Sequence, residues 1–205
     1  MTSRVNVIIK SVLASLVVFA AAFAVNAQNR NNRGGAEVIQ GTVVLYGSAM
    51  NTRTYVLPFQ LRLTGETSPD QVRSLLGTLQ ESGEDEVLDR IRKTDLGSFT
   101  LNNRIGPRIN FVSEDMVNGQ RRVFVVFERW MQFAELRGGY RSTDYPFGVF
   151  EMYFDPRTGK GTGTYIPAAR IRWHTDKKTG QGQVEIENFA TYPGRLMGLT
   201  SSQRG

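Results

Sequence analysis

The chain lacks cysteine entirely and has a single histidine, His174. Without cysteine it can form no disulfide, thiol nucleophile or iron–sulfur cluster. A catalytic zinc site usually takes several histidine or cysteine ligands. A Ser-His-Asp triad could use only His174, and neither G-x-S-x-G nor S-x-x-K accompanies it. The sequence therefore predicts no catalytic residue, no metal site and no cofactor, and it favours a protein that is not an enzyme.

Long apolar runs are also missing, except at the N-terminus. Arg4 and Lys10 precede an uncharged apolar run at residues 12–25, and Val25-Asn26-Ala27 has compact residues at the positions that a signal peptidase reads. This pattern predicts a signal peptide over residues 1–27 and export to the periplasm or the exterior. The alternative is an uncleaved anchor, which needs about 20 apolar residues. After cleavage we expect no membrane span.

The charge balance is mildly basic. The net charge of +6 falls to +4 once Arg4 and Lys10 leave with the signal peptide. The remaining basic residues are scattered and match no nucleic-acid motif, so nucleic acid is not an expected partner. A small positive charge favours contact with anionic envelope material, and the expected partner is an unidentified ligand or envelope component.

The predicted mature chain forms one domain. Its first residues, 28–36, begin QNRNNRGG, and this polar composition predicts a disordered N-terminus. Residues 37–199 are expected to form a single β-rich domain, and residues 200–205 are expected to fray.

The strongest structural signal lies at residues 121–130 (RRVFVVFERW). Five β-branched or aromatic residues between charged ends predict a strand buried on both faces, with alternation extending through Met131 and Phe133 to Leu136. Strands are also predicted at residues 37–46 and 54–63. Pro58 cannot donate a ladder hydrogen bond, which places the second of these strands at a sheet edge or a bulge.

A helical hairpin is predicted after the second strand. Ser68 as N-cap, Pro69 at the first helical position and Gln71 three residues after the cap begin one helix, and Gly83 ends it. The apolar stripe of this helix is expected to cover one face of the strand at 121–130. A second helix has acidic residues in its first turn and basic residues in its last, which suits the helix dipole.

The rest of the chain has β patterns. Strands are expected at 98–101, 108–112, 147–154, 161–166, 168–174 and 183–189. In the last hairpin, pairing Ile171 with Ile186 also sets Arg170 opposite Glu187 and Arg172 opposite Glu185. The order of elements predicts an α+β domain, mainly antiparallel β, with one helical hairpin inserted after the second strand. An open sheet, a sandwich and a partly closed barrel all remain possible.

The first candidate site is the loop at residues 140–147. It gathers aromatic and charged residues of the types enriched at binding hot spots. The alternative is a structural loop whose aromatic rings close the end of the core. The candidate ligand-binding residues are Tyr140, Arg141, Asp144, Tyr145 and Phe147.

The second candidate site is the solvent face of the strand at 168–174, with Arg170, Arg172 and His174. The glutamates expected opposite these arginines favour a structural role for this face. A third possibility is a pair of carboxylates for glycan hydrolysis. The carboxylates available for it are Glu128, Glu135, Asp144 and Glu151.

Three functions are compatible with these features. The first is a non-enzymatic exported domain that binds a ligand or an envelope component. The second is a secreted carboxylate-dependent hydrolase, and the third is a structural or assembly protein that uses the edge of the Pro58 strand. In each case we expect function beyond the ends of the strand at 121–130, where the 140–147 loop, Glu128 and Arg129 emerge from the core.

Two stretches, TSPDQVRSLLGTLQ and RSTDYPFGVFEM, resemble exported bacterial proteins of unknown function. The resemblance runs from Ser68 through Phe150, which is just under half of the predicted mature chain. It implies no activity and no catalytic residues.

Cleavage after Ala27 is testable by expressing the full chain in a bacterium and sequencing the N-terminus of the exported protein. The expected first residue is Gln28, because the peptidase reads the compact residues Val25 and Ala27. An exported or membrane-bound product that still begins at Met1 would contradict cleavage.

Overall fold

The computed structural model describes residues 35–46, 53–131, 137, 141–175, 182–189 and 192–203. The strands are β1 (Glu37–Leu45), β2 (Tyr55–Leu63), β3 (Gly97–Leu101), β4 (Arg104–Arg108), β5 (Phe111–Val117), β6 (Gln120–Glu128), β7 (Phe147–Phe154), β8 (Lys160–Thr175), β9 (Gly182–Asn188) and β10 (Gly194–Gln203). The helices are α1 (Pro69–Ser82), α2 (Glu84–Ile91) and the short 3-10 helix η1 (Arg141–Asp144).

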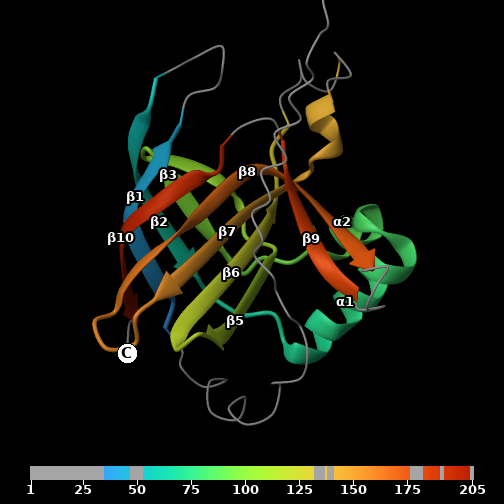
Figure 1. The fold of residues 1–205 in the computed structure, drawn as a ribbon, viewed down its shortest axis with the longest axis horizontal. Coiled ribbons are helices and arrows are strands. Elements are labelled where there is room, and N and C mark those ends of the chain that lie inside the picture. Colours follow the sequence, from blue (N-terminus) through green and yellow to red (C-terminus); the bar gives the residue numbers. More distant parts are fainter. Residues whose placement is uncertain are drawn as a thin grey trace, which may run out of the picture.

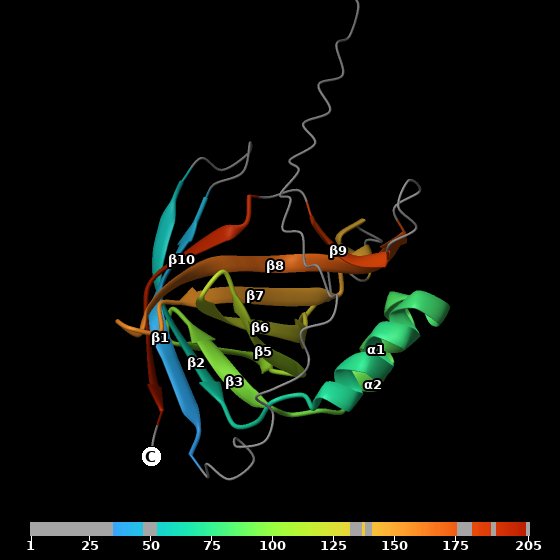
Figure 2. The ribbon, with the colours of Figure 1, turned by 60° about the horizontal axis from the view of Figure 1, so that its bottom comes forward.

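The ten strands form one antiparallel sheet. Its order is β4-β3-β2-β1-β10-β8-β7-β6-β5, and β9 pairs with β8 beside this path. The sheet curls strongly without closing, and α1 and α2 lie to one side of it, near β8 and β9 (Figures 1 and 2). The predicted α+β class and the helical hairpin after β2 are confirmed, and the question of closure is answered by an open, curled sheet.

The helical hairpin begins and ends where the sequence predicts. The Ser68 side chain accepts a hydrogen bond from the Gln71 backbone N–H at 3.3 Å, and the Gln71 side chain accepts one from the Ser68 N–H at 3.1 Å. This reciprocal capping box satisfies two N–H groups that have no partner within the helix. Gly83 separates α1 from α2 with φ 85°, a conformation that favours glycine.

The concave side of the sheet is filled by aromatic rings. Phe150 contacts three phenylalanine rings and Tyr165, with ring centroids 4.7–5.4 Å apart. Val123, Val125 and Phe127 of β6 belong to the same buried cluster. The three phenylalanines around Phe150 are Phe59, Phe99 and Phe127.

A second apolar cluster lies between the convex side of the sheet and the helices. Val126 of β6 belongs to this cluster, and Phe124 packs against it. The helices contribute Leu79, Val87, Leu88 and Ile91, and β7 and β8 contribute Phe147, Val149, Ala169 and Ile171. The strand at 121–130 is therefore buried on both faces, as predicted, and the helical hairpin covers one of them.

The β8–β9 hairpin has the predicted register. Ile171 lies opposite Ile186, Arg170 opposite Glu187 and Arg172 opposite Glu185. The two strands expected at 161–166 and 168–174 are, however, one strand of 16 residues. Pro167 lies where the β7–β8 register shifts, between the pairs Val149–Ile166 and Phe147–Ala169, so an irregularity accommodates the proline without ending the strand.

The Pro58 strand is not at an edge. β2 pairs with β1 along its whole length and with β3 from Phe59 onward. The Pro58 carbonyl accepts a hydrogen bond from the Asn102 N–H, on the side of β2 that faces β3. The N–H that proline lacks would point to this same side, where β3 has already ended in its turn. Because N and O of one residue point the same way in a strand, Pro58 costs no bond to β1.

Three other boundaries differ from expectation. β6 ends at Glu128, and Phe133 and Leu136 lie outside the described residues. The expected loop at 102–107 is mostly β4, because the turn is confined to Asn102 and Asn103, whose φ angles are 51° and 59°. The expected strand at 108–112 is in fact the junction of β4 and β5.

The C-terminal segment is ordered through Gln203. β10 pairs with β1 as far as Gln203–Glu37, and the Ser201 hydroxyl donates a hydrogen bond to the Glu37 carboxylate at 2.5 Å. Residues 200–203, which belong to the segment expected to fray, pair with β1.

The buried Tyr165 makes the free energy of unfolding depend on pH in the alkaline range. Burial raises the pKa of Tyr165 from 10.0 to about 12. Between these pH values the unfolded chain loses the proton and the folded protein keeps it, so the contribution present below pH 10 is lost as pH rises toward 12. Between about pH 9 and 11.5 we expect the free energy of unfolding to fall in the parent and to fall less in Tyr165→Phe. The difference between the two falls is on the order of 2 kcal/mol.

Urea unfolding across this pH range measures the difference. Tyr192→Phe is the matched control, because the Tyr192 side chain is 68% exposed. Parallel pH profiles for the parent and Tyr165→Phe would contradict the assignment.

Candidate functional site

The two ends of the sheet meet at one point of the chain. β4 and β5 are the terminal strands of the sheet order, yet only Ile109 and Asn110 separate them. One segment thus pairs first with β3 and then, after a bend, with β6. We call this bend, with the adjacent end of β6, the seam.

Asn110 holds the seam together. It is 3% exposed, and its backbone N–H donates to the Val126 carbonyl at 3.1 Å. Its side-chain amide donates to the Thr94 carbonyl at 2.9 Å and accepts from the Glu128 N–H at 2.8 Å. The side chain therefore replaces the strand partner that β6 loses where β5 begins.

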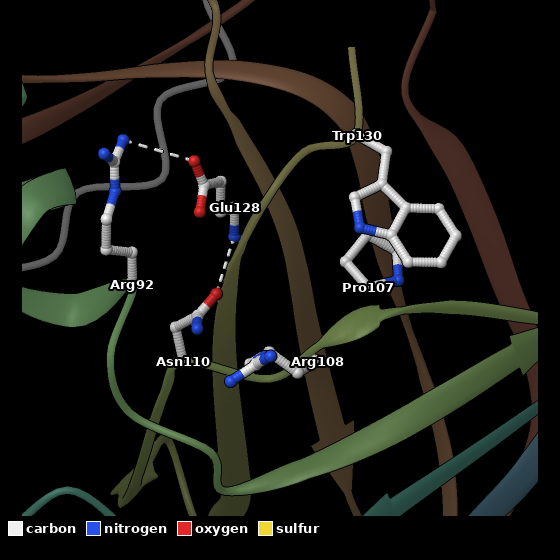
Figure 3. A pocket seen from close by; sticks show the side chains of 6 residues that line it. All are labelled: Arg92, Pro107, Arg108, Asn110, Glu128 and Trp130. Carbon is white, nitrogen blue, oxygen red and sulfur yellow. Dashed lines mark hydrogen bonds and ion pairs between the residues drawn. The ribbon is translucent and has the colours of Figure 1, made fainter. Parts of the chain in front are cut away.

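A cleft of about 280 Å³ opens at the seam (Figure 3). Trp130 is 66% exposed although it directly follows the buried part of β6. Arg92, at the end of α2, pairs with Glu128 at 3.2 Å. The residues that line this seam cleft are Arg92, Pro107, Arg108, Asn110, Glu128 and Trp130.

The chemistry of the seam cleft is that of a binding surface. Arg108 is exposed, and its side chain makes no hydrogen bond or ion pair within the described part of the chain. An exposed indole beside an arginine is the combination most enriched at binding hot spots. With Arg92 partly neutralised by Glu128, the cleft keeps a net positive charge that suits an anionic group.

The predicted loop site has a different environment. Tyr145 is 7% exposed, donates its hydroxyl to the Glu187 carboxylate at 2.6 Å and packs on Phe189 with centroids 4.9 Å apart. Phe147 is fully buried in the helix-facing cluster, whereas Asp144 is exposed. Tyr140 and the side chain of Arg141 lie outside the described residues. The positions of Tyr145 and Phe147 match the structural alternative, in which the loop closes the core.

Arg129 explains why this loop is held against the sheet. Its Nε donates to the Tyr145 carbonyl at 3.0 Å, and a second guanidinium nitrogen donates to the Ser142 carbonyl at 2.8 Å. The Arg129 N–H also donates to the Pro146 carbonyl at 2.8 Å. This charged residue at the end of β6 is thus a structural clamp.

The second candidate face is largely neutralised. Arg170 donates to Glu84 at 2.5 Å, and Glu84 also accepts from the Ile171 N–H at 3.2 Å. Burial raises the pKa of Glu84, although Arg170 opposes the shift. Arg172 pairs with Glu187 at 3.7 Å, and His174 is exposed. The register sets Arg170 opposite Glu187 and Arg172 opposite Glu185. The observed ion pairs differ, because Arg170 pairs with Glu84 of α2 and Arg172 pairs with Glu187.

Two of the carboxylate candidates, Glu128 and Glu151, lie far apart along the strands. Glu128 lies in the seam cleft, whereas Glu151 lies opposite Phe124, four residues back along β6. Four residues of strand span about 13 Å, more than the roughly 10 Å limit of a glycosidase pair. Glu151 accepts the Tyr153 hydroxyl at 2.8 Å and lies 3.6 Å from Arg122. Glu135 lies outside the described residues.

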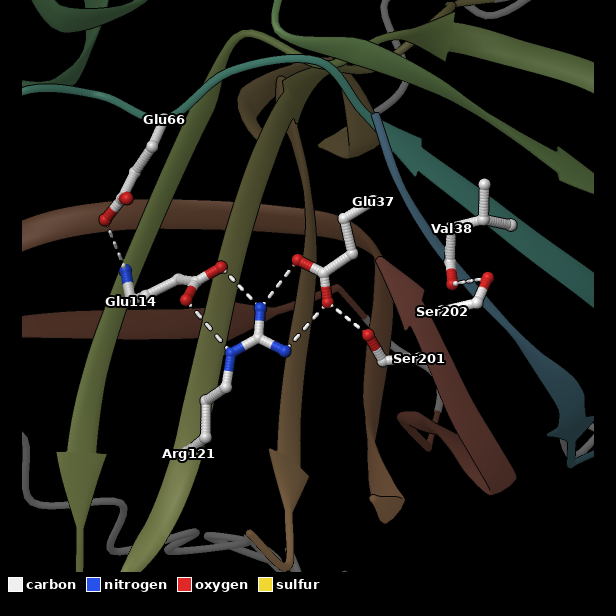
Figure 4. Close-up of polar contacts among 7 residues, drawn as sticks. All are labelled: Glu37, Val38, Glu66, Glu114, Arg121, Ser201 and Ser202. Carbon is white, nitrogen blue, oxygen red and sulfur yellow. Dashed lines mark hydrogen bonds and ion pairs between the residues drawn. The ribbon is translucent and has the colours of Figure 1, made fainter. Parts of the chain in front are cut away.

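Two buried arginines are structural. Arg121 joins β6 to β1 across the concave side through Glu37 at 2.6 and 2.7 Å, and to β5 through Glu114 at 2.5 and 2.9 Å (Figure 4). Burial opposes its charge, but these carboxylates outweigh burial and raise the pKa of Arg121. Arg122, on the convex side, is paired with Asp115 at 2.5 Å. Both arginines are saturated by carboxylates and are poorly placed to bind a ligand.

Within the residues that the structure describes, no helix is long and apolar enough to cross a membrane. In the same residues, no group of three or more potential metal-binding side chains comes together. Comparison with known proteins adds no identification, because no family model, curated protein or solved structure matches the chain.

The sequence indicated part of the seam cleft and missed the rest. Function was expected where Glu128 emerges from the core, and Trp130 lies two residues further on. Arg92, Arg108 and Asn110 gave no signal, because they come from a helix end, a short strand and a bend that only the curled sheet brings together. A polar asparagine between apolar residues, as in Ile109-Asn110-Phe111, was the one available hint.

Asn110→Ala tests the seam. The substitution leaves the Thr94 carbonyl and the Glu128 N–H without their partner, and each lost partner of this kind costs about 1–3 kcal/mol. We expect a loss of about 2–3 kcal/mol in the free energy of unfolding, measured by urea denaturation. Gln60→Ala, on the exposed side of β2, is the control. A loss no larger than that of the control would show that Asn110 does not secure the seam.

Proposed function

We propose that this protein is an exported, non-enzymatic binding domain that takes its ligand in the seam cleft. The observation that carries the proposal is the 66% exposure of Trp130 beside Arg108, whose side chain has no ion-pair partner among the residues that the structure describes. Burying a large apolar side chain stabilises a protein by on the order of 2–3 kcal/mol, and an exposed indole does not make this contribution. A ligand that covers Trp130 buries the indole and gains this free energy on binding.

The composition of the interior supports the same proposal. Phe59, Phe99, Phe127, Phe150 and Tyr165 fill the concave side of the sheet, where a ligand would otherwise be held. Binding is therefore assigned to the surface. The predicted signal peptide makes a periplasmic or extracellular envelope component the expected partner, in line with the resemblance to exported bacterial proteins.

The hydrolase and assembly alternatives have less support. Glu128 and Glu151 are too far apart along the strands to act on one glycosidic bond. The assembly hypothesis relied on an open edge at the Pro58 strand, and β2 instead lies between β1 and β3.

Tryptophan fluorescence tests the proposal directly. The chain has two tryptophans, so Trp173→Phe leaves Trp130 as the only reporter. Separate polysaccharide, lipid-vesicle and peptide fractions of a bacterial envelope extract are titrated into this variant. We expect one fraction to shift the Trp130 emission and to bind Trp130→Ala at least tenfold more weakly by calorimetry, since hot-spot truncation costs 2 kcal/mol or more.

Trp130→Phe, which retains Trp173, is the control for emission changes that arise elsewhere. The proposal fails if no fraction changes the Trp130 emission. It also fails if the active fraction binds Trp130→Ala as tightly as it binds the parent.

A further inference from the structure

A second basic surface adjoins the seam cleft on the convex face of β2, β3 and β4. Arg62 lies opposite Ser98 in the β2–β3 ladder, and Ser98 lies opposite Arg108 in the β3–β4 ladder. The three residues therefore form one row across the strands. Neighbouring strands are about 4.8 Å apart, which sets the two arginine backbones about 10 Å apart with a hydroxyl between them.

This row lines a shallow groove of about 640 Å³. Gly97 allows the close strand approach at one end, since a Cβ there would lie 2.0 Å from the Arg62 carbonyl oxygen. Ile105, 73% exposed, adds an apolar contact. The groove is lined by Arg62, Thr64, Asp95, Gly97, Ser98, Ile105, Gly106 and Arg108.

Arg62 and Arg108 differ from most other arginines in the fold. Both are exposed, and neither side chain has a hydrogen bond or ion pair to any described residue. By contrast, eight other arginines among the described residues have a carboxylate within 4 Å. They are Arg73, Arg90, Arg92, Arg121, Arg122, Arg157, Arg170 and Arg172.

Asp95 is the one carboxylate in the groove. Its Oδ1 accepts a hydrogen bond from the Gly97 N–H at 3.2 Å. Its single negative charge offsets only one of the two arginines. The groove therefore keeps a net positive charge, and its guanidinium forks have free donors for a carboxylate, sulfate or phosphate group.

Arg108 lines both the groove and the seam cleft, so the two adjoin at this residue, and we refer to the surface from Arg62 through Arg108 to Trp130 as the path. The path offers arginines for anionic groups, the Thr64 and Ser98 hydroxyls for hydrogen bonds, and a flat indole for the apolar face of a ring. We infer that it binds an acidic oligosaccharide, whose sugar rings and charged substituents match this series. This inference rests on the proposed function of the seam cleft.

The test uses hexagalacturonate as the acidic probe and maltohexaose as its uncharged counterpart, with binding measured by calorimetry. We expect hexagalacturonate to bind, maltohexaose to bind at least tenfold more weakly, and added salt to weaken the acidic probe selectively. Arg62→Gln should weaken hexagalacturonate binding about tenfold, because it removes one charge-assisted contact. Arg195→Gln, an exposed arginine on β10 that lines neither cleft, should leave binding unchanged.

Three results would overturn the inference. They are no binding of hexagalacturonate, equal binding of the two oligosaccharides, or equal effects of Arg62→Gln and Arg195→Gln. Phosphatidylglycerol vesicles are a further arm, and vesicle binding that depends on Arg62 while hexagalacturonate stays unbound would point to a lipid instead. Thermal unfolding confirms that each variant is folded.

Trp130→Ala separates this inference from the proposed function. If the Trp130 emission shifts on addition of an envelope fraction that contains no acidic saccharide, the seam cleft is a binding site and the inference is wrong. If Arg62→Gln weakens hexagalacturonate binding and Trp130→Ala does not, the arginine row binds the acidic saccharide and the proposed seam site is wrong.

Discussion

The burial of β6 on both faces is the constraint on which the rest of the structure depends. Alternate residues of this strand enter two different apolar clusters, one filled by aromatic rings and the other covered by the helices. A strand of this kind needs the sheet to curl over one face and a separate layer to cover the other. The insertion of α1 and α2 after β2 supplies that layer (Figure 2).

Curling brings the ends of the sheet together without pairing them. The chain crosses from one end to the other at Asn110, whose side chain takes over the hydrogen bonding that a further strand would provide. Arg121 performs a similar task on the concave side, where it links β6 to β1 through Glu37 and to β5 through Glu114 (Figure 4). The incomplete closure leaves Trp130 and Arg108 exposed, so the seam cleft is a consequence of how the sheet ends.

The proposed ligand path follows from where charge is left unpaired. Among the described residues, eight arginines have a carboxylate within 4 Å. Arg62 and Arg108 do not, and they lie in one row beside the open end of the sheet. A surface of this kind can recognise an anionic partner without losing a structural contact.

The sequence alone determined the features that depend on neighbours in the chain. These include the capping box at Ser68, the two helices, the alternation of β6 and the register of Ile171 with Ile186. Each arises from periodicity or short-range hydrogen bonding, which a single sequence displays. The tertiary structure alone decided that β2 is internal, that Tyr145 and Phe147 close the core, and that Arg92, Arg108 and Trp130 share a cleft. These facts depend on the curl of the sheet, which brings together residues that are distant along the chain.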